Sequence, residues 1–122
     1  MNIPRLPDAE LEVMKLVWKY GENTTSAMIN EGLKGYKEWN PTTVLTFLSR
    51  LADKGFVSIE KKGKANYYTP LIEEARYVES ESKSFLKRLH DNSIKSLFVA
   101  LYSGKEISKK DLEELKQFVE ER

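Results

Sequence analysis

The stretch WNPTTVLTFLSRLADKGFVSIEKKGKANYYTP, residues 39–70, decides the fold of this 122-residue chain. Asn40 precedes Pro41, which disfavours helix at the asparagine, whereas a proline suits the first turn of a helix. Apolar residues then recur at positions 44, 47, 48 and 51, the spacing of one helical face. We therefore predict a helix from Pro41 to about Lys54, ended by Gly55.

The period of the pattern changes directly after this helix. Residues 57–61, Val-Ser-Ile-Glu-Lys, alternate apolar and polar side chains, as a half-buried strand does. Residues 62–66 have the composition of a turn, residues 67–69 are expected to return as a second strand, and Pro70 closes the unit. The sequence thus predicts a helix followed by a β-hairpin.

Two more helices are predicted upstream of this stretch. Asp8 is a suitable N-cap for a helix over residues 8–20, and Glu10 lies near the positive end of its dipole. Residues 24–26, Thr-Thr-Ser, offer caps for a short second helix that Gly35 ends.

Residues 37–39 are expected to form a brief extended piece before the third helix. The predicted order is then helix, helix, short strand, helix, hairpin. This is the order of a winged helix-turn-helix domain, which we place over residues 1–70.

The chain after Pro70 has the pattern of a helical dimerisation domain, residues 71–122. Steps of three and four separate the residues at 75, 78, 82, 85 and 89, which is typical of a seam between helices. Because three short helices bury little surface alone, we expect a symmetric homodimer. The expected dimerisation residues are Val78, Phe85, Leu89, Ile94, Leu97, Phe98, Leu101, Leu112, Leu115 and Val119. The predicted fold class is mainly α with a small β-hairpin.

Composition narrows the class of protein. There is no cysteine, which excludes disulfides and thiolate metal sites, and no apolar run approaches the roughly 20 residues of a membrane span. The N-terminus lacks a signal-peptide pattern, so a cytoplasmic protein is expected. Net charge is only +1, but residues 50–64 hold five basic and two acidic side chains. Local charge therefore favours a nucleic-acid partner where global charge does not.

The predicted third helix and the hairpin turn supply the candidate site. Thr42, Thr43 and Thr46 lie opposite the apolar stripe, where hydroxyls and methyls suit base edges. Arg50, one turn later, and Lys61, Lys62 and Lys64 at the tip of the hairpin suit DNA phosphates. The alternative is a winged-helix protein–protein module whose basic turn is only solvated.

An enzyme has little support in this sequence. His90 is the single histidine, and it fits a surface position at a helix end. No nucleophile–histidine set, glycine-rich phosphate loop or metal-ligand cluster is apparent, so neither a cofactor nor a metal is expected.

The sequence resembles a known family, the BlaI/MecI/CopY penicillinase-type transcriptional repressors. The resemblance rests on residues 8–14 (DAELEVM) with Val17-Trp18, on residues 39–55, on Tyr67-Tyr68-Thr69-Pro70 and on residues 84–86 (SFL). It implies a winged-helix DNA-binding domain, a helical dimerisation domain and repression of resistance genes from inverted-repeat operators. It also implies that Thr42, Thr43 and Thr46 enter the major groove.

The resemblance further implies how repression ends. The penicillinase repressors are cut between an Asn and a Phe in the dimerisation domain, through a protease or membrane sensor pathway. The corresponding pair here is Ala100-Leu101, so the scissile residues differ. The copper-sensing branch uses cysteines, which this chain lacks, and copper sensing is therefore not expected.

Overall fold

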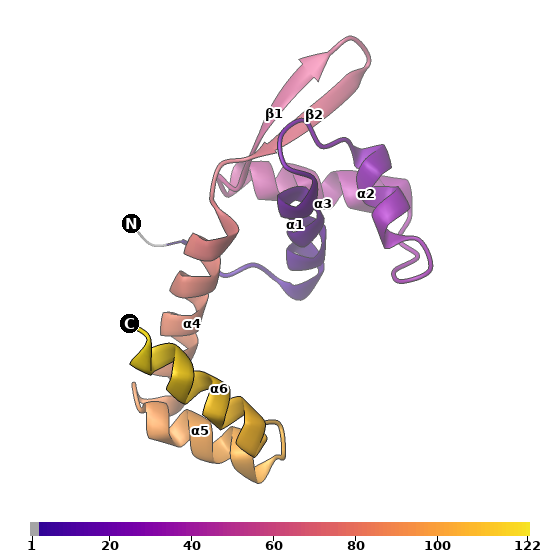
Figure 1. Ribbon diagram of the computed structural model, residues 1–122. Coiled ribbons are helices and arrows are strands. Elements are labelled where there is room, and N and C mark those ends of the chain that lie inside the picture. Colours follow the sequence, from indigo (N-terminus) through magenta and orange to yellow (C-terminus); the bar gives the residue numbers. More distant parts are fainter. Residues whose placement is uncertain (1–2) are drawn as a thin grey trace. The chain divides into compact units, whose positions relative to one another are not determined.

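The computed structural model describes residues 3–122, which form two compact units (Figure 1). The N-terminal unit ends at Ser80, and the C-terminal unit covers Glu81–Arg122. In chain order the elements are α1 (Asp8–Tyr20), α2 (Ser26–Leu33), α3 (Pro41–Asp53), β1 (Val57–Lys62), β2 (Ala65–Pro70), α4 (Glu74–His90), α5 (Ile94–Ser103) and α6 (Lys109–Glu120). The predicted class, mainly α with a small β-hairpin, is confirmed.

The three helices of the N-terminal unit begin through different local devices. α3 begins as predicted, with Pro41 in its first turn and the Asn40 side chain accepting a hydrogen bond from the Thr42 amide at 2.9 Å. α2 is capped by Thr25. The prediction that Asp8 caps α1 was wrong by one position. The Pro7 carbonyl already accepts the Leu11 amide, so Pro7 is the N-cap and Asp8 is helical.

β1 and β2 form an antiparallel hairpin with Val57 opposite Pro70 and Lys62 opposite Ala65. The strands are longer and the turn is tighter than predicted, because Gly63 at φ +64° lets the chain reverse sharply. The expected extended piece at residues 37–39 is not a strand. Instead Thr24, between α1 and α2, pairs with Tyr68 through two backbone hydrogen bonds of 2.7 and 2.9 Å.

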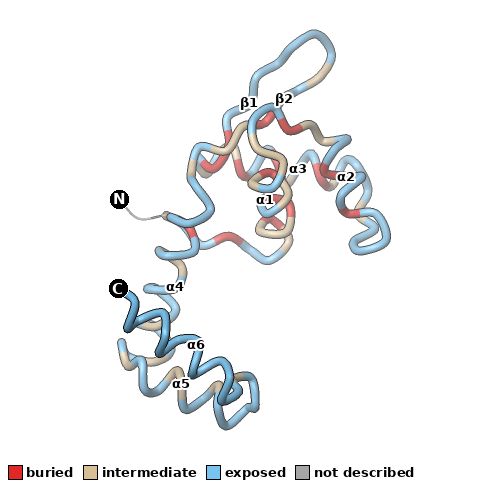
Figure 2. The backbone as a smooth tube through the Cα atoms, in the orientation of Figure 1, coloured by how far each residue is buried: buried red, intermediate tan, exposed pale blue. Residues whose placement is uncertain are grey.

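The core of the N-terminal unit is formed where the apolar faces of α1, α2 and α3 meet the base of the hairpin, as the buried segments in Figure 2 show. Phe56, between α3 and β1, is its largest fully buried side chain. The first turn of α4 joins this core, because Tyr77 is buried and its hydroxyl accepts the Leu6 amide at 2.9 Å. Trp18 likewise donates to the Ile72 carbonyl at 2.8 Å.

The C-terminal unit contains the rest of α4 with α5 and α6. Serine caps begin α5 and α6: the Ser93 hydroxyl accepts the Ser96 amide, and Ser108 and Asp111 form a reciprocal capping box. Asp91 and Asn92 turn the chain between α4 and α5 at positive φ. No residue in Glu81–Arg122 is buried, although the stripes of α5 and α6 are strongly apolar. None of the helices within residues 3–122 is long and apolar enough to cross a membrane.

Candidate nucleic-acid interface

α3 has two faces of opposite character. Val44, Leu48 and Leu51 are completely buried against the rest of the N-terminal unit. The side chains on the other face are exposed, and they are Thr42, Leu45, Thr46, Ser49, Arg50 and Asp53. The helix is therefore fixed along one side and offers a mainly polar row of side chains along the other, which is what a helix needs to enter a DNA groove.

The three predicted threonines are not equivalent. Thr42 is exposed beside the N-cap, and its amide is already engaged by Asn40. Thr43 is half-buried, and its amide donates to the Asn40 carbonyl at 2.9 Å. Thr46 is exposed, but its hydroxyl donates to the Thr42 carbonyl at 3.1 Å. Thr46 therefore offers a partner an acceptor oxygen and a methyl group while that bond is kept.

The basic residues divide between the helix and the hairpin. Arg50 is exposed two turns into α3. Lys61, Lys62 and Lys64 are exposed around the tip of the hairpin, which projects from the helices (Figure 1). The Lys62 ammonium lies 5.3 Å from the centre of the Tyr67 ring, a contact that holds the charge over the strand.

One ion pair, between α1 and the end of α3, was not predicted from the sequence. Glu10 on α1 is buried, and its carboxylate accepts a hydrogen bond from Lys54 at the end of α3. A glutamate in the first turn of a helix is already explained by the helix dipole, so the local pattern does not reveal this tertiary contact. The pair joins the candidate DNA-facing helix to α1.

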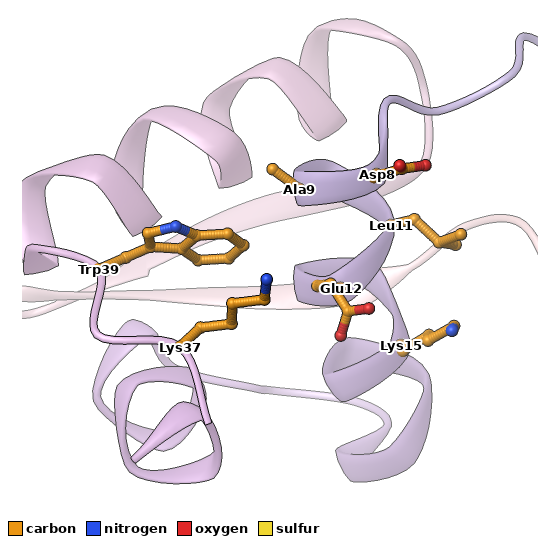
Figure 3. A pocket seen from close by; sticks show the side chains of 7 residues that line it. All are labelled: Asp8, Ala9, Leu11, Glu12, Lys15, Lys37 and Trp39. Carbon is orange, nitrogen blue, oxygen red and sulfur yellow. The ribbon is translucent and has the colours of Figure 1, made fainter. Parts of the chain in front are cut away.

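A groove of about 490 Å³ lies between the start of α1 and the segment before α3 (Figure 3). Lys37 and Trp39 extend from that segment toward the side of α1 that carries Glu12. The lining residues are Asp8, Ala9, Leu11, Glu12, Lys15, Lys37 and Trp39. Because two acidic and two basic side chains line the groove, their charges cancel and give no net attraction for phosphate.

The expected dimerisation residues are all at least partly exposed. Val78, Leu89 and Ile94 are more than half exposed, as is Val119. Leu97, Phe98 and Leu101 are partly buried within the C-terminal unit. Phe85, Leu112 and Leu115 are exposed at about two fifths of their surface. An apolar hollow of about 260 Å³ separates α5 from α6, lined by Phe98, Val99, Tyr102, Ser103, Ile107 and Leu112.

Ala100 and Leu101, the pair that the family resemblance predicts as the cleavage position, lie inside α5. Their carbonyls accept the amides of Gly104 and Glu106, which end the helix. The peptide bond between them is therefore held in helical geometry within the C-terminal unit.

Comparison with known proteins identifies relatives of the whole chain. Residues 6–121 match the family model described as penicillinase repressor. The penicillinase repressor of Bacillus licheniformis is 39% identical over 120 residues, 98% of this chain and 93% of the relative. The methicillin resistance regulatory protein MecI of Staphylococcus aureus is 28% identical over 117 residues, 96% of this chain and 94% of the relative.

Two solved structures match the N-terminal part of the chain. The DNA-binding domain of the repressor BlaI has a TM-score of 0.54 and 40% identity over 63% of this chain and 94% of that one. Monomeric Bacillus licheniformis BlaI in complex with the blaP half-operator has a TM-score of 0.52 and 39% identity, covering 62% of this chain and 92% of that one.

Proposed function

This chain belongs to the penicillinase repressor family, and from that membership we propose that it is a homodimeric transcriptional repressor that binds inverted-repeat operators in double-stranded DNA. The observation that carries the proposal is the exposed polar face of α3, buried along its other side and followed by a basic hairpin. A relative with this N-terminal fold was solved on a half-operator, which supports the same use of the fold here.

In the proposed complex α3 lies in the major groove. Thr42, Thr43 and Thr46 contact base edges near the start of the helix, where the groove admits an α-helix. Arg50 contacts a phosphate. Lys61, Lys62 and Lys64 follow the backbone beside the groove, so they contribute affinity without sequence preference.

The C-terminal unit is proposed to form the dimer. A unit of this size without one buried residue cannot be stabilised by its own core, because folding must offset about 1–2 kcal/mol of backbone entropy per residue. The exposed apolar stripes of α4, α5 and α6 supply the missing burial when a second copy covers them. Joining two N-terminal units in one dimer then raises the apparent affinity for the operator by roughly 10²–10⁴-fold.

The proposed targets are β-lactam-resistance or related genes, as the names of the relatives suggest. We propose that repression ends when the dimer is lost, for example by a cut near Ala100–Leu101 by a protease or a membrane sensor pathway. Because this bond lies inside α5, cleavage requires the helix to open first.

Binding to duplex DNA tests the function directly. The probes are a fluorescent penicillinase-type inverted-repeat duplex and a scrambled duplex, each at low and near-physiological salt. We expect the repeat to be favoured by roughly 10³-fold or more. The double variant Thr43→Ala, Thr46→Ala is expected to lose that preference. Equal binding to both duplexes would show that the protein binds DNA but does not recognise this operator. Binding to neither would favour a protein–protein module.

A further inference from the structure

Leu45 is the large apolar side chain on the exposed face of α3. It is 43% exposed, whereas Val44 and Leu48, the neighbouring residues on the buried side of the helix, are completely buried. A single exposed leucine is ordinary on a protein surface. This one is distinguished by its position, one turn after Thr42 and one turn before Ser49, along the edge of the face that we propose enters the groove.

Thr46, the next residue of α3, also presents an apolar group. Its hydroxyl proton is donated to the Thr42 carbonyl, so its methyl group and an acceptor oxygen remain for a partner. Leu45 has no hydrogen-bonding group at all. While that bond is kept, neither side chain can donate a hydrogen bond to a base edge.

The major groove of DNA presents one apolar group, the 5-methyl group of thymine. Resting on the proposed function, we propose that Leu45 contacts a thymine methyl group in each operator half-site and so selects thymine at that position. At the same position, the other bases present hydrogen-bond donors and acceptors. Leu45 would remove water from these groups without hydrogen-bonding to them, so the other bases are disfavoured there. Leu45 is therefore a specificity-determining residue as well as part of the docking surface.

Replacement of thymine by uracil tests this contact, because it removes the methyl group and leaves base pairing intact. The probe is a duplex selected from a randomised pool by the full-length protein, with each thymine replaced in turn. We expect one position in each half-site where uracil weakens binding about fourfold, the value of burying one methyl-sized group. With Leu45→Gln, the same replacement should change binding by less than about 1.5-fold.

Leu71→Gln is the matched control, since Leu71 is also exposed in the N-terminal unit but lies outside α3 and the hairpin. It should keep the full response to uracil. Leu45→Gln retains a long side chain with good helix propensity, and helical circular dichroism verifies that it folds. Equal responses in wild type and Leu45→Gln, or no response in wild type, would overturn the inference and leave the repressor function standing. Failure to select any duplex would overturn both.

Discussion

The carboxylate of Glu10 on α1 is paired with the ammonium of Lys54 at the end of α3, across 44 residues of sequence. Glu10 is buried, with its side chain 4% exposed, whereas Lys54 is about one third exposed. The pair holds the C-terminal end of α3, the candidate DNA-facing helix, against α1.

Removal of the cation should therefore destabilise the N-terminal unit. Lys54→Met leaves a buried carboxylate without its partner, and we expect a loss of about 2 kcal/mol, below the 3–5 kcal/mol of fully buried pairs because Lys54 is partly solvated. Urea unfolding followed by tryptophan fluorescence measures this, since Trp18 and Trp39 both lie in the N-terminal unit.

The matched control is Lys34→Met, because Lys34 pairs with Glu31 while both side chains are about three quarters exposed. It should cost less than about 0.5 kcal/mol. The double variant Glu10→Met, Lys54→Met should recover most of the loss. Equal stability of Lys54→Met and Lys34→Met would contradict a structural role for the buried pair.

Tyr77 links the first turn of α4 to the segment before α1, because its hydroxyl accepts a hydrogen bond from the Leu6 amide. Tyr77→Phe keeps the ring contacts with Trp18 and Phe56 but leaves the Leu6 amide without its acceptor. We expect a loss of roughly 1–2 kcal/mol in the same unfolding experiment. Tyr36→Phe, at an exposed tyrosine, should have no measurable effect. An unchanged free energy of unfolding in Tyr77→Phe would show that water accepts the Leu6 amide in place of the hydroxyl.

The hairpin lysines should contribute affinity without specificity. The triple variant of Lys61, Lys62 and Lys64 to Gln should weaken binding to operator and scrambled duplex alike. The slope of log K against log salt should fall by about 1 for each phosphate that the variant no longer neutralises.

The matched control changes three exposed lysines of the C-terminal unit to Gln, namely Lys95, Lys109 and Lys110. Their removal should leave the slope unchanged. A slope that is the same in both triple variants would show that the hairpin does not touch the DNA backbone.

The proposed dimer should depend on the apolar stripe of α6. Leu115→Asp places a charge within the stripe, and burying it unpaired is costly, so sedimentation should show monomers where the wild type is dimeric. Gln117→Asp, on the opposite face by helical spacing, should leave the dimer intact. A chain ending at Val99 should likewise lose the dimer and bind the operator weakly. Full operator binding by that truncated chain would refute the proposed route of derepression.

Asp111 gives the start of α6 a specific response to acid. Hydrogen bonds from the Ser108 amide and hydroxyl hold the pKa of this carboxyl below its usual 3.8. A lowered pKa in the folded state means that the contribution to stability is present above pH 3.8 and is lost as pH falls through the folded pKa.

The Ser108 amide resonance reports this titration, and its midpoint should lie below 3.8. In Asp111→Asn the acid-induced change at Ser108 should disappear. A midpoint at or above the usual value would show that the capping box does not persist in solution.

Local sequence determined the elements that depend on nearby residues. Asn40-Pro41 fixes the start of α3, because a proline at this point disfavours helix before it and favours helix after it. The alternation after Phe56 determines the hairpin, and Ser108 with Asp111 determines the start of α6. Each is decided within a few residues, so each could be predicted.

Tertiary structure alone decided which distant groups meet. The ion pair of Glu10 with Lys54 forms only when the helices pack together. The same is true of the hydrogen bond from the Leu6 amide to the Tyr77 hydroxyl. The backbone pairing of Thr24 with Tyr68 likewise requires the hairpin to pack against the helices. None of these pairs has a local signature, because a buried polar group needs a partner but that need does not specify where in the chain the partner lies. The same packing leaves the threonine face of α3 exposed and leaves the C-terminal stripes without a cover. The sequence thus determined where the amphipathic helix α3 begins and ends, and the packing of the chain decided which of its faces is exposed.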